Sequence, residues 1–365
     1  MTSDRFASRR QKLIQSVRKA GLPSLLVTNP KNVSYLTGFT GEDSYLLIGP
    51  SILRIFSDSR FETQLQDECP SLPAEIRTSR QTMSDFLAKQ IPLFRVNQVG
   101  IESTSMTVSV FNHLKGSVDS VELVSTSGLV EELRQVKDAD EIDQLRIAIR
   151  EAEMGYSLMR SMIVPEMTEQ QAAHELEHGM RRFGARKAAF EPIIAVGDRS
   201  ALPHYRAGLR RFNESPFVLC DWGAVSPKGY HSDLTRVWGT GKVPPKLHRI
   251  YGVVLNAQQA AIAAIRPGAK CQDVDGVARK VIEEAGFGKH FGHGLGHGIG
   301  LDIHEGPRLS PISQDELKPG MVVTVEPGIY LPGIGGVRIE DDVLVTRDGF
   351  EVMTSVSREM GGVIS

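Results

Sequence analysis

The chain has 365 residues, more than one ordinary hydrophobic core takes, so two domains are expected. Its formal net charge of −2 and its hydrophobic content of 41% are typical of a soluble globular protein, without the basic excess of a nucleic-acid binder or an apolar run that could cross a membrane. Three scattered cysteines (Cys69, Cys220, Cys271) and a charged N-terminus without a following apolar segment predict a reduced, cytoplasmic protein.

The first third of the chain alternates helix and strand patterns. Residues 4–20 form an amphipathic pattern that predicts a helix ending at Gly21. Short apolar runs bounded by Gly, Pro and Asp predict strands at 24–29, 45–49, 52–57 and 99–102. We therefore expect a small α/β domain over residues 1–128, ending at a Ser/Thr/Gly-rich stretch.

The remaining residues, 129–365, combine long helical patterns with strand patterns. Apolar residues recur at three- and four-residue spacing after Asp140, which predicts a long helix. A capping box of Thr168 and Gln171 predicts the start of a second helix. Further helices are expected at 246–265 and 272–285. This part is predicted to be an α+β domain whose strongly curved antiparallel sheet is backed by helices.

One strand pattern bears directly on chemistry. Between residues 337 and 345, Val and Ile alternate with other residues at period two, as on a strand with one buried face. Arg338 and Glu340 occupy the other face in this alternation. The pattern therefore predicts that the Glu340 carboxylate points away from the apolar side of the sheet.

Five side chains with metal-binding chemistry follow one another in the last part of the chain: Asp221, Asp233, His297, Glu326 and Glu340. Four carboxylates and one imidazole are too many ionisable groups to bury at strand-like positions without compensation, because an unpaired buried carboxylate is costly. Divalent cations provide that compensation, and shared carboxylates bridge pairs of metal ions. The pattern predicts a hydrolytic site with two metals.

Asp221 and Asp233 are separated by a segment rich in turn residues. This arrangement predicts two strands joined by a loop, which brings both carboxylates toward one pocket. A pair of turn-forming aspartates without a metal is the alternative interpretation, and from these two residues alone both remain open.

The stretch GHGLGHGIG has glycine at every second position from 292 to 300. Because each glycine would cost about 1 kcal/mol in a helix, His293 and His297 are expected on an extended segment rather than as a helical pair. Missing side chains there let another backbone or a metal approach closely. The spacing does not match a phosphate-binding glycine loop.

Taken together, these residues resemble the Xaa-Pro aminopeptidase and Xaa-Pro dipeptidase (prolidase) family. Members are metallopeptidases of the pita-bread fold with a creatinase-like N-terminal domain. The resemblance spans nearly the whole chain and rests on motifs in the family's order. These motifs are SDLTR, GHGLGHGIGLDIHE, VTVEPGIY and GGVRIEDD, and the apolar strand that ends at Asp221. It implies hydrolysis of peptides with proline in the second position, in a homodimer.

The resemblance also implies roles for the five ligands. Asp233 and Glu340 bridge two divalent ions, Asp221 completes one, and His297 and Glu326 complete the other. Oxygen-rich ligation favours Mn²⁺, with Co²⁺, Fe²⁺ and Zn²⁺ as alternatives. The interval from Asp221 to Asp233 is one residue longer than usual in the family, and we expect the loop at 226–227 to absorb it.

Further residues take roles by the same resemblance. Glu326 also transfers a proton to the leaving nitrogen, and His204 and His304 stabilise the reacting carbonyl. The residues expected to bind substrate are His293, Arg308 and Arg338. Without the resemblance, His204 is a lone loop histidine, and Arg308 and Arg338 are equally well explained as surface arginines.

Three other interpretations are open. Residues 174–178 read His-Glu-Leu-Glu-His, which matches the zincin signature but lacks its extended form. A relative with the same fold and a non-peptide substrate is the second, and a binding protein that has lost catalysis is the third. The complete ligand set argues against the second, and the intact Glu326, His304 and His204 argue against the third.

Overall fold

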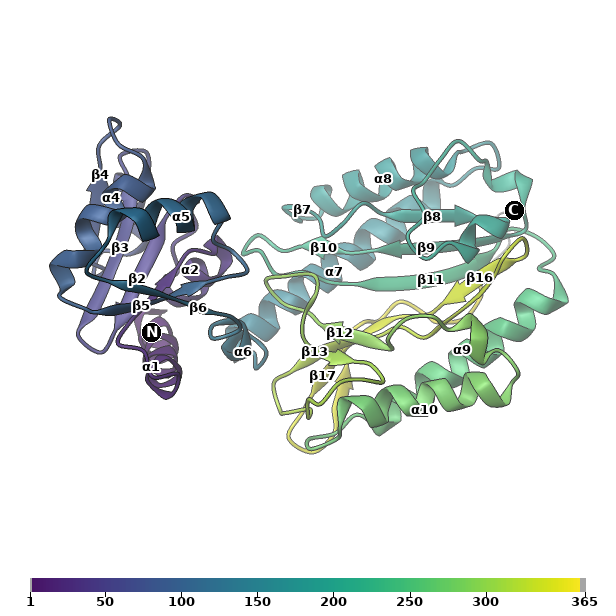
Figure 1. Cartoon of the computed structure of the whole chain (residues 1–365). Coiled ribbons are helices and arrows are strands. Elements are labelled where there is room, and N and C mark those ends of the chain that lie inside the picture. The colour runs from purple at the N-terminus through teal and green to yellow at the C-terminus, as the bar shows by residue number, and fades with distance from the viewer. Residues whose placement is uncertain (1, 362–365) are drawn as a thin grey trace. The chain divides into compact units, whose positions relative to one another are not determined.

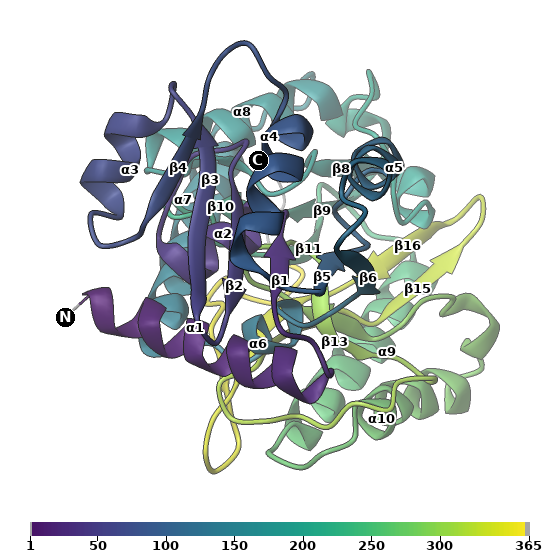
Figure 2. The same ribbon diagram turned by 60° about the vertical axis from the view of Figure 1, so that its left-hand side comes forward.

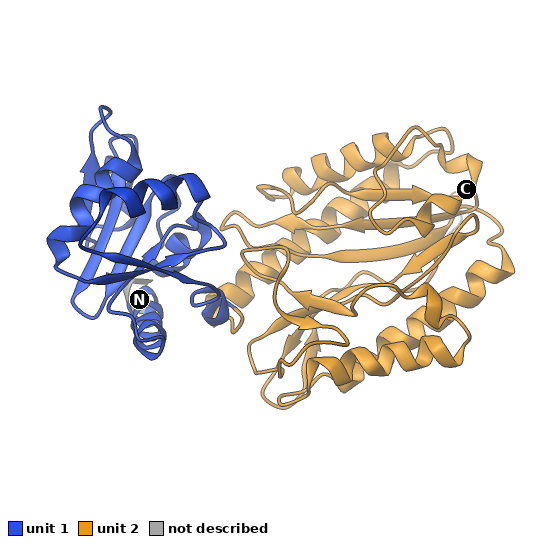
Figure 3. Ribbon diagram, in the orientation of Figure 1, with its two compact units in different colours: residues 1–134 blue, residues 135–365 orange. Residues whose placement is uncertain are grey.

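The structure of the protein, a computed structural model, describes residues 2–361. The chain divides into two compact units, residues 1–134 and residues 135–365 (Figure 3). The short helix α6 (Glu131–Arg134) ends the first unit, where the buried Arg134 donates a hydrogen bond of 2.8 Å to Asn32. Among the described residues, no helix is both long enough and apolar enough to span a membrane.

The first unit is built on a six-stranded mixed sheet in the order β4-β3-β2-β1-β5-β6 (Figure 2). Strands β1, β5 and β6 run parallel, whereas β2 is antiparallel to both β1 and β3. The strands are β1 (Leu25–Val27), β2 (Tyr45–Gly49), β3 (Ile52–Asp58), β4 (Ala74–Arg77), β5 (Gln98–Glu102) and β6 (Glu122–Thr126). The strands expected from the four apolar runs are therefore present.

Helices and one 3-10 turn accompany this sheet. They are α1 (Thr2–Lys19), α2 (Pro30–Thr37), α3 (Glu62–Glu68), α4 (Met83–Gln90), η1 (Ile91–Phe94) and α5 (Val108–Ser117). Buried Leu and Phe side chains of the sheet and of α4 form the core of this unit. At the start of α2, the buried Glu102 accepts the backbone N–H groups of Thr28 and Asn29 at 2.6 and 2.7 Å, which stabilises the helix N-terminus.

Two long helices of the second unit cover one antiparallel sheet. These are α7 (Ala139–Met162) and α8 (Glu169–Arg182), and both begin with capping boxes, that of α8 formed by Thr168 and Gln171 as expected. The sheet has the order β11-β9-β8, with β8 (Ile193–Val196), β9 (Phe217–Trp222) and β11 (Leu234–Gly239). Tyr156 of α7 stacks on Trp222 of β9 at 4.2 Å between ring centroids, in the core that joins these layers.

A second helix pair, α9 (Pro245–Ala264) and α10 (Cys271–Glu284), lies side by side in both views (Figure 1, Figure 2). It packs in one core with a five-stranded sheet in the order β13-β12-β14-β17-β18 and with a separate hairpin. The strands of the sheet are β12 (Gly296–Gly298), β13 (Glu305–Leu309), β14 (Val322–Val325), β17 (Asp341–Val345) and β18 (Phe350–Val352).

Short elements complete this unit. The separate hairpin consists of β15 (Gly328–Leu331) and β16 (Gly335–Arg338). A small ladder pairs β7 (Lys187–Ala188) with β10 (Ala224–Val225), and the 3-10 turns are η2 (Gly197–Ala201), η3 (Phe212–Glu214) and η4 (Gly288–His290).

The segment 337–345 is not one continuous strand. It divides into β16 and β17, which belong to different sheets, with residues 339 and 340 between them. Glu340 forms an isolated antiparallel bridge with Thr235 of β11, and its N–H donates to the Thr235 carbonyl at 3.2 Å. The four Val and Ile side chains still enter the core, so the predicted separation of faces is correct although the strand is interrupted.

Candidate metal centre

A hairpin carries Asp221 and Asp233. Asp221 of β9 pairs with Thr235 of β11, and the same register continues to the bridge between Val225 and His231. Asp233 therefore lies two pairs further along and on the same face as Asp221, because side chains two residues apart share a face. The turn is confined to residues 226–230, and both Asp221 and Asp233 lie outside it.

His297 lies on β12 with its backbone pressed between two neighbouring strands. A Cβ on Gly296 would lie 2.0 Å from the Thr324 carbonyl oxygen, and one on Gly298 would lie 2.0 Å from the Gly306 carbonyl oxygen. The glycines thus allow close backbone approach, as expected. His297 Nδ1 lies 3.1 Å from the Gly298 carbonyl oxygen, which can only accept, so Nδ1 carries the proton and Nε2 keeps its lone pair.

Glu326 follows β14 and Glu340 precedes β17, and threonine hydroxyls hold both. Thr324 donates to Glu326 Oε1 at 3.3 Å and accepts the His297 backbone N–H at 3.1 Å. Thr235 donates to Glu340 Oε2 at 2.6 Å. Each carboxylate therefore has one oriented oxygen before any cation is considered.

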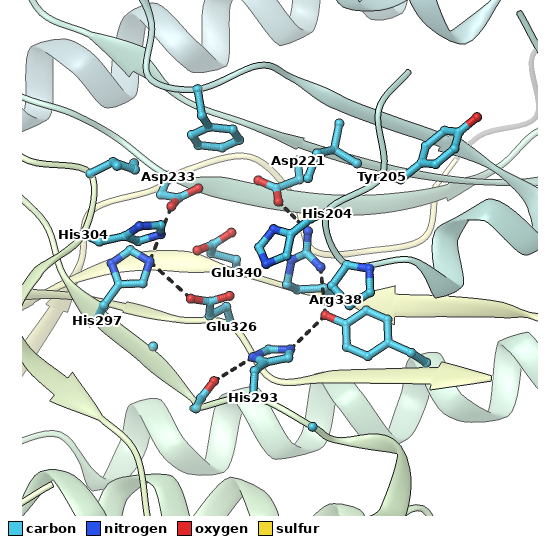
Figure 4. A pocket seen from close by; sticks show the side chains of 18 of the residues that line it. His204, Tyr205, Asp221, Asp233, His293, His297, His304, Glu326, Arg338 and Glu340 are labelled. Atoms are coloured by element: carbon cyan, nitrogen blue, oxygen red, sulfur yellow. Dashed lines mark hydrogen bonds and ion pairs between the residues drawn. The ribbon is translucent and has the colours of Figure 1, made fainter. Parts of the chain in front are cut away.

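The structure brings all five residues together (Figure 4). Three overlapping groups have potential ligand atoms within 4.8 Å of one another: Asp221, Asp233 and Glu340; His297, Glu326 and Glu340; and Asp233, His297 and His304. His297 Nε2 lies 3.3 Å from Glu326 Oε1 and 3.7 Å from Asp233 Oδ2. Asp233, His297 and Glu340 each belong to two of the three groups, so the groups form one continuous cluster of potential ligand atoms.

The buried carboxylates of this cluster lack enough positive charge nearby to stabilise their ionised forms. Burial raises the pKa of Asp221, raises those of Asp233 and Glu340 well above the ordinary range, and raises that of Glu326 to about 7. Burial also lowers the pKa of His297 to about 3, so this imidazole supplies no positive charge. Asp221 Oδ1 is buried without a hydrogen-bond partner among the described residues. The donor set therefore fits divalent cations.

A chain of hydrogen bonds fixes Arg338 beside the cluster. Its guanidinium forms an ion pair with Asp221 and donates to Thr235 Oγ1 at 3.1 Å and to Tyr330 Oη at 2.8 Å. Because Tyr330 accepts from Arg338, its own proton is directed to His293 Nε2 at 2.9 Å. His293 Nδ1 then donates to the Gly294 carbonyl oxygen at 2.7 Å, so both of its ring nitrogens are engaged within the protein.

The cluster opens into a cavity of about 740 Å³. All ten sequence-predicted site residues line it, including His204, His304 and Arg308. The His304 ring meets the His297 ring edge-to-face at 4.4 Å. Arg308 is exposed on β13, directly opposite His297 in the strand register. A cavity of this volume accommodates a small peptide.

Two family models account for most of the chain. The model described as metallopeptidase family M24 matches residues 143–347, which include the whole cluster. The chain belongs to metallopeptidase family M24. The model described as the creatinase/prolidase N-terminal domain matches residues 9–136. The predicted fold class, an α/β domain followed by a pita-bread catalytic domain, is therefore confirmed, as is the prediction of a metal-dependent hydrolase.

Individual relatives of this M24 metallopeptidase match it over nearly its full length. It is 34% identical over 351 residues to the Xaa-Pro dipeptidase of Pyrococcus horikoshii, covering 96% of this chain and 97% of the relative. The Xaa-Pro dipeptidase structure from Bacillus anthracis has 38% identity and a TM-score of 0.93, covering 97% of this chain and 99% of that one. The X-Pro aminopeptidase structure from Thermotoga maritima has 33% identity and a TM-score of 0.86, covering 94% and 99%.

The zincin-like pattern lies elsewhere in this M24 chain. His174 and His178 are exposed on α8. Within residues 2–361, none of the three groups able to hold a metal includes either histidine. The pattern is a solvated helix face.

Sequence reasoning did not identify two residues of the M24 site, Thr235 and Tyr330. Thr235 lies two residues after Asp233, so the period of a strand was a usable signal that both share a face. Tyr330 has no such signal, because its contacts with Arg338 and His293 depend on how the hairpin of β15 and β16 meets β12.

Proposed function

We propose that this M24 metallopeptidase hydrolyses Xaa-Pro bonds with two divalent cations. The proposed ligands are Asp221, Asp233, His297, Glu326 and Glu340. One observation carries the proposal, namely a buried cluster of four carboxylates and a neutral imidazole whose ligand atoms fall into overlapping groups. Asp233 and Glu340 are the proposed bridging ligands, since they are the two carboxylates that belong to two of those groups and a carboxylate has two oxygens to share between cations.

Bound cations would polarise the scissile carbonyl and acidify a water molecule. Mn²⁺ is the proposed metal, because four of the five proposed ligands are carboxylates and oxygen ligands suit the harder divalent ions. The threonine bonds to Glu326 and Glu340, and the bond from His297 Nδ1 to the Gly298 carbonyl, orient these side chains toward that role.

The chain's own side chains would move the proton and hold the substrate. Glu326, which lines the cavity, would take a proton from water and pass it to the leaving imino nitrogen. His204 and His304, which line the same cavity, would donate hydrogen bonds to the carbonyl oxygen as negative charge develops there. His293 and Arg338 are proposed to shape the substrate-binding wall, fixed by Tyr330.

We favour a dipeptidase. Arg308 is an exposed cation in the cavity, opposite His297, where it can form a charge-assisted contact with the C-terminal carboxylate of an Xaa-Pro dipeptide. The relatives named Xaa-Pro dipeptidase are consistent with this choice, and the X-Pro aminopeptidase of Thermotoga maritima represents the alternative. We also propose that the protein is a cytoplasmic homodimer. Sedimentation of the purified protein measures the oligomeric state.

The test is a kinetic comparison after chelation. The metal-free enzyme is supplied with Mn²⁺ and assayed on an Xaa-Pro dipeptide and on the corresponding Xaa-Pro-Yaa tripeptide. We expect activity only after Mn²⁺ is added, and a higher kcat/KM for the dipeptide. Preference for the tripeptide would make the protein an aminopeptidase, and no cleavage of either peptide with metal bound would refute Xaa-Pro hydrolysis.

A further inference from the structure

Helix α8 begins with a buried carboxylate outside the metal cluster. Glu169 is the first residue of the helix and is 0% exposed. None of the groups able to hold a metal in the described part of the chain contains it. A carboxylate in such a position is costly unless its oxygens accept hydrogen bonds, so its partners indicate what the residue does.

Three donors from two different segments converge on Glu169. Oε1 accepts the backbone N–H of Val196, at the end of β8, at 2.8 Å. Oε2 accepts the Tyr205 hydroxyl at 2.8 Å and the backbone N–H of Gly208 at 3.0 Å. One side chain thus joins the edge strand of the sheet to the loop that follows η2.

Backbone bonds strengthen the same connection. The N–H of Glu169 donates to the Arg210 carbonyl at 2.9 Å, and the N–H of Gln170 donates to the Gly208 carbonyl at 2.9 Å. These are N–H groups of the first helical turn, which have no partner within the helix. The N-terminal turn of α8 therefore holds the 205–210 segment through both its backbone and its carboxylate.

This loop carries His204 into the cavity. His204 and Tyr205 both line the cavity, yet the Tyr205 hydroxyl points away from the carboxylate cluster, toward its bond with Glu169 (Figure 4). His204 is exposed and has no strand of its own to fix it, because it lies in an irregular segment after η2. Its position consequently depends on how firmly the neighbouring residues are held.

We propose that Glu169 is a positioning residue that holds His204 at the reacting carbonyl through Tyr205 and Gly208. The inference rests on the proposed role of His204 and adds a residue that touches neither metal nor substrate. A misplacement of about 1 Å at a catalytic group can cost on the order of a hundredfold in rate. Losing this connection should therefore lower kcat while leaving the metal content unchanged.

The test is a double-mutant cycle between Glu169→Gln and His204→Ala, with each enzyme loaded with Mn²⁺ and its metal content measured. We expect Glu169→Gln alone to lower kcat on an Xaa-Pro dipeptide by roughly tenfold to a hundredfold, with a smaller change in KM. In the His204→Ala background the same change should alter kcat by less than about twofold. Glu177→Gln, an exposed substitution on the same helix, is the matched control and should behave as wild type.

Tyr205→Phe is the milder variant, because it removes one donor and leaves both backbone bonds to Glu169 in place. Tyr205→Phe should lower kcat in the wild-type background and leave kcat nearly unchanged in the His204→Ala background. It replaces Glu169→Gln in the double-mutant cycle if the Glu169 variant does not fold. Hydrogen exchange of residues 203–209 should increase in the Glu169→Gln or Tyr205→Phe enzyme, with residues 217–239 unchanged.

Two results would overturn the inference in different ways. If His204→Ala lowers kcat, but Glu169→Gln lowers kcat by the same factor in wild type and in the His204→Ala background, Glu169 does not act through His204. The proposed function then stands. If His204→Ala leaves kcat unchanged with metal bound, the proposed role of His204 is wrong and Glu169 has nothing to position.

Discussion

The Thr235 hydroxyl donates a hydrogen bond of 2.6 Å to Glu340 Oε2 and accepts one of 3.1 Å from Arg338 Nε. The Thr235 backbone also forms the bridge to Glu340 and pairs with Asp221. One threonine therefore contacts two proposed metal ligands and the arginine between them. In metal sites such outer contacts orient the ligands and tune their basicity.

Thr235→Val should weaken Mn²⁺ binding by roughly tenfold to a hundredfold, since it keeps the shape and removes both hydrogen bonds. Calorimetric titration of the chelated protein with Mn²⁺ measures the effect. Thr240→Val is the matched control, because the Thr240 hydroxyl follows the same strand and donates to the Ser215 carbonyl at 2.7 Å, away from the proposed ligands. Equal affinity of the Thr235 variant and wild type would show that the contact does not orient Glu340.

Glu326→Gln should lower kcat by at least about a hundredfold, because it removes the proposed proton carrier and one negative charge. Metal binding should weaken at the same time, so the assay is run at saturating Mn²⁺ with the bound metal counted. Near-normal turnover with two metals bound would assign proton transfer to another group.

Much of this site followed from the order and spacing of polar residues. Alternation around Arg338 and Glu340 placed both on the polar face, and the glycines around His297 indicated close packing, because such patterns depend on local geometry. The sequence did not reveal the strand break at 339–340. The break arises because β16 pairs with β15 in a separate hairpin, whereas β17 pairs within the five-stranded sheet.

Contacts between distant segments could not be predicted in the same way. Tyr330 contacts His293 only because its hairpin packs against another sheet. Glu169, at the N-terminus of α8, bonds Tyr205 and Gly208 of the loop that carries His204. Neither contact leaves a periodic pattern in the sequence. Arg338 illustrates the same limit, since surface and site positions looked alike until its ion pair with Asp221 was seen.

Arg308→Ala should raise KM for Xaa-Pro dipeptides and change the kinetics of longer peptides little. When the bound dipeptide excludes water from this contact, the expected loss is roughly 2–3 kcal/mol, the value of a hydrogen bond to a charged group. Steady-state kinetics on a dipeptide and a tripeptide measure it.

Arg206→Ala provides the control for charge alone, because Arg206 also lines the cavity but lies 3.6 Å from Glu191 in an exposed ion pair. A dipeptide KM that rises in the Arg206 variant and not in the Arg308 variant would assign the carboxylate contact to Arg206 instead.

Glu151→Gln should stabilise the protein, and more at pH 8 than at pH 5. Glu151 on α7 is 3% exposed, and burial raises its pKa to about 7. Because this pKa is above that of the unfolded chain, the folded state binds more protons, and stability falls as pH rises through 7. Thermal unfolding should show a gain of a few degrees in Tm at pH 8 and little at pH 5. A gain independent of pH would indicate a change in packing instead.

The most direct test of the metal centre is the metal content of purified variants after chelation and reloading with Mn²⁺. Wild type should hold two ions per chain, while Asp233→Ala and Glu340→Ala should lose metal and Xaa-Pro hydrolysis together, because each carboxylate is proposed to bridge both ions. His174→Ala and His178→Ala should keep two ions and full activity. Two metals retained in the Asp233 and Glu340 variants, or metal lost from the His174 or His178 variants, would contradict the proposed ligand set.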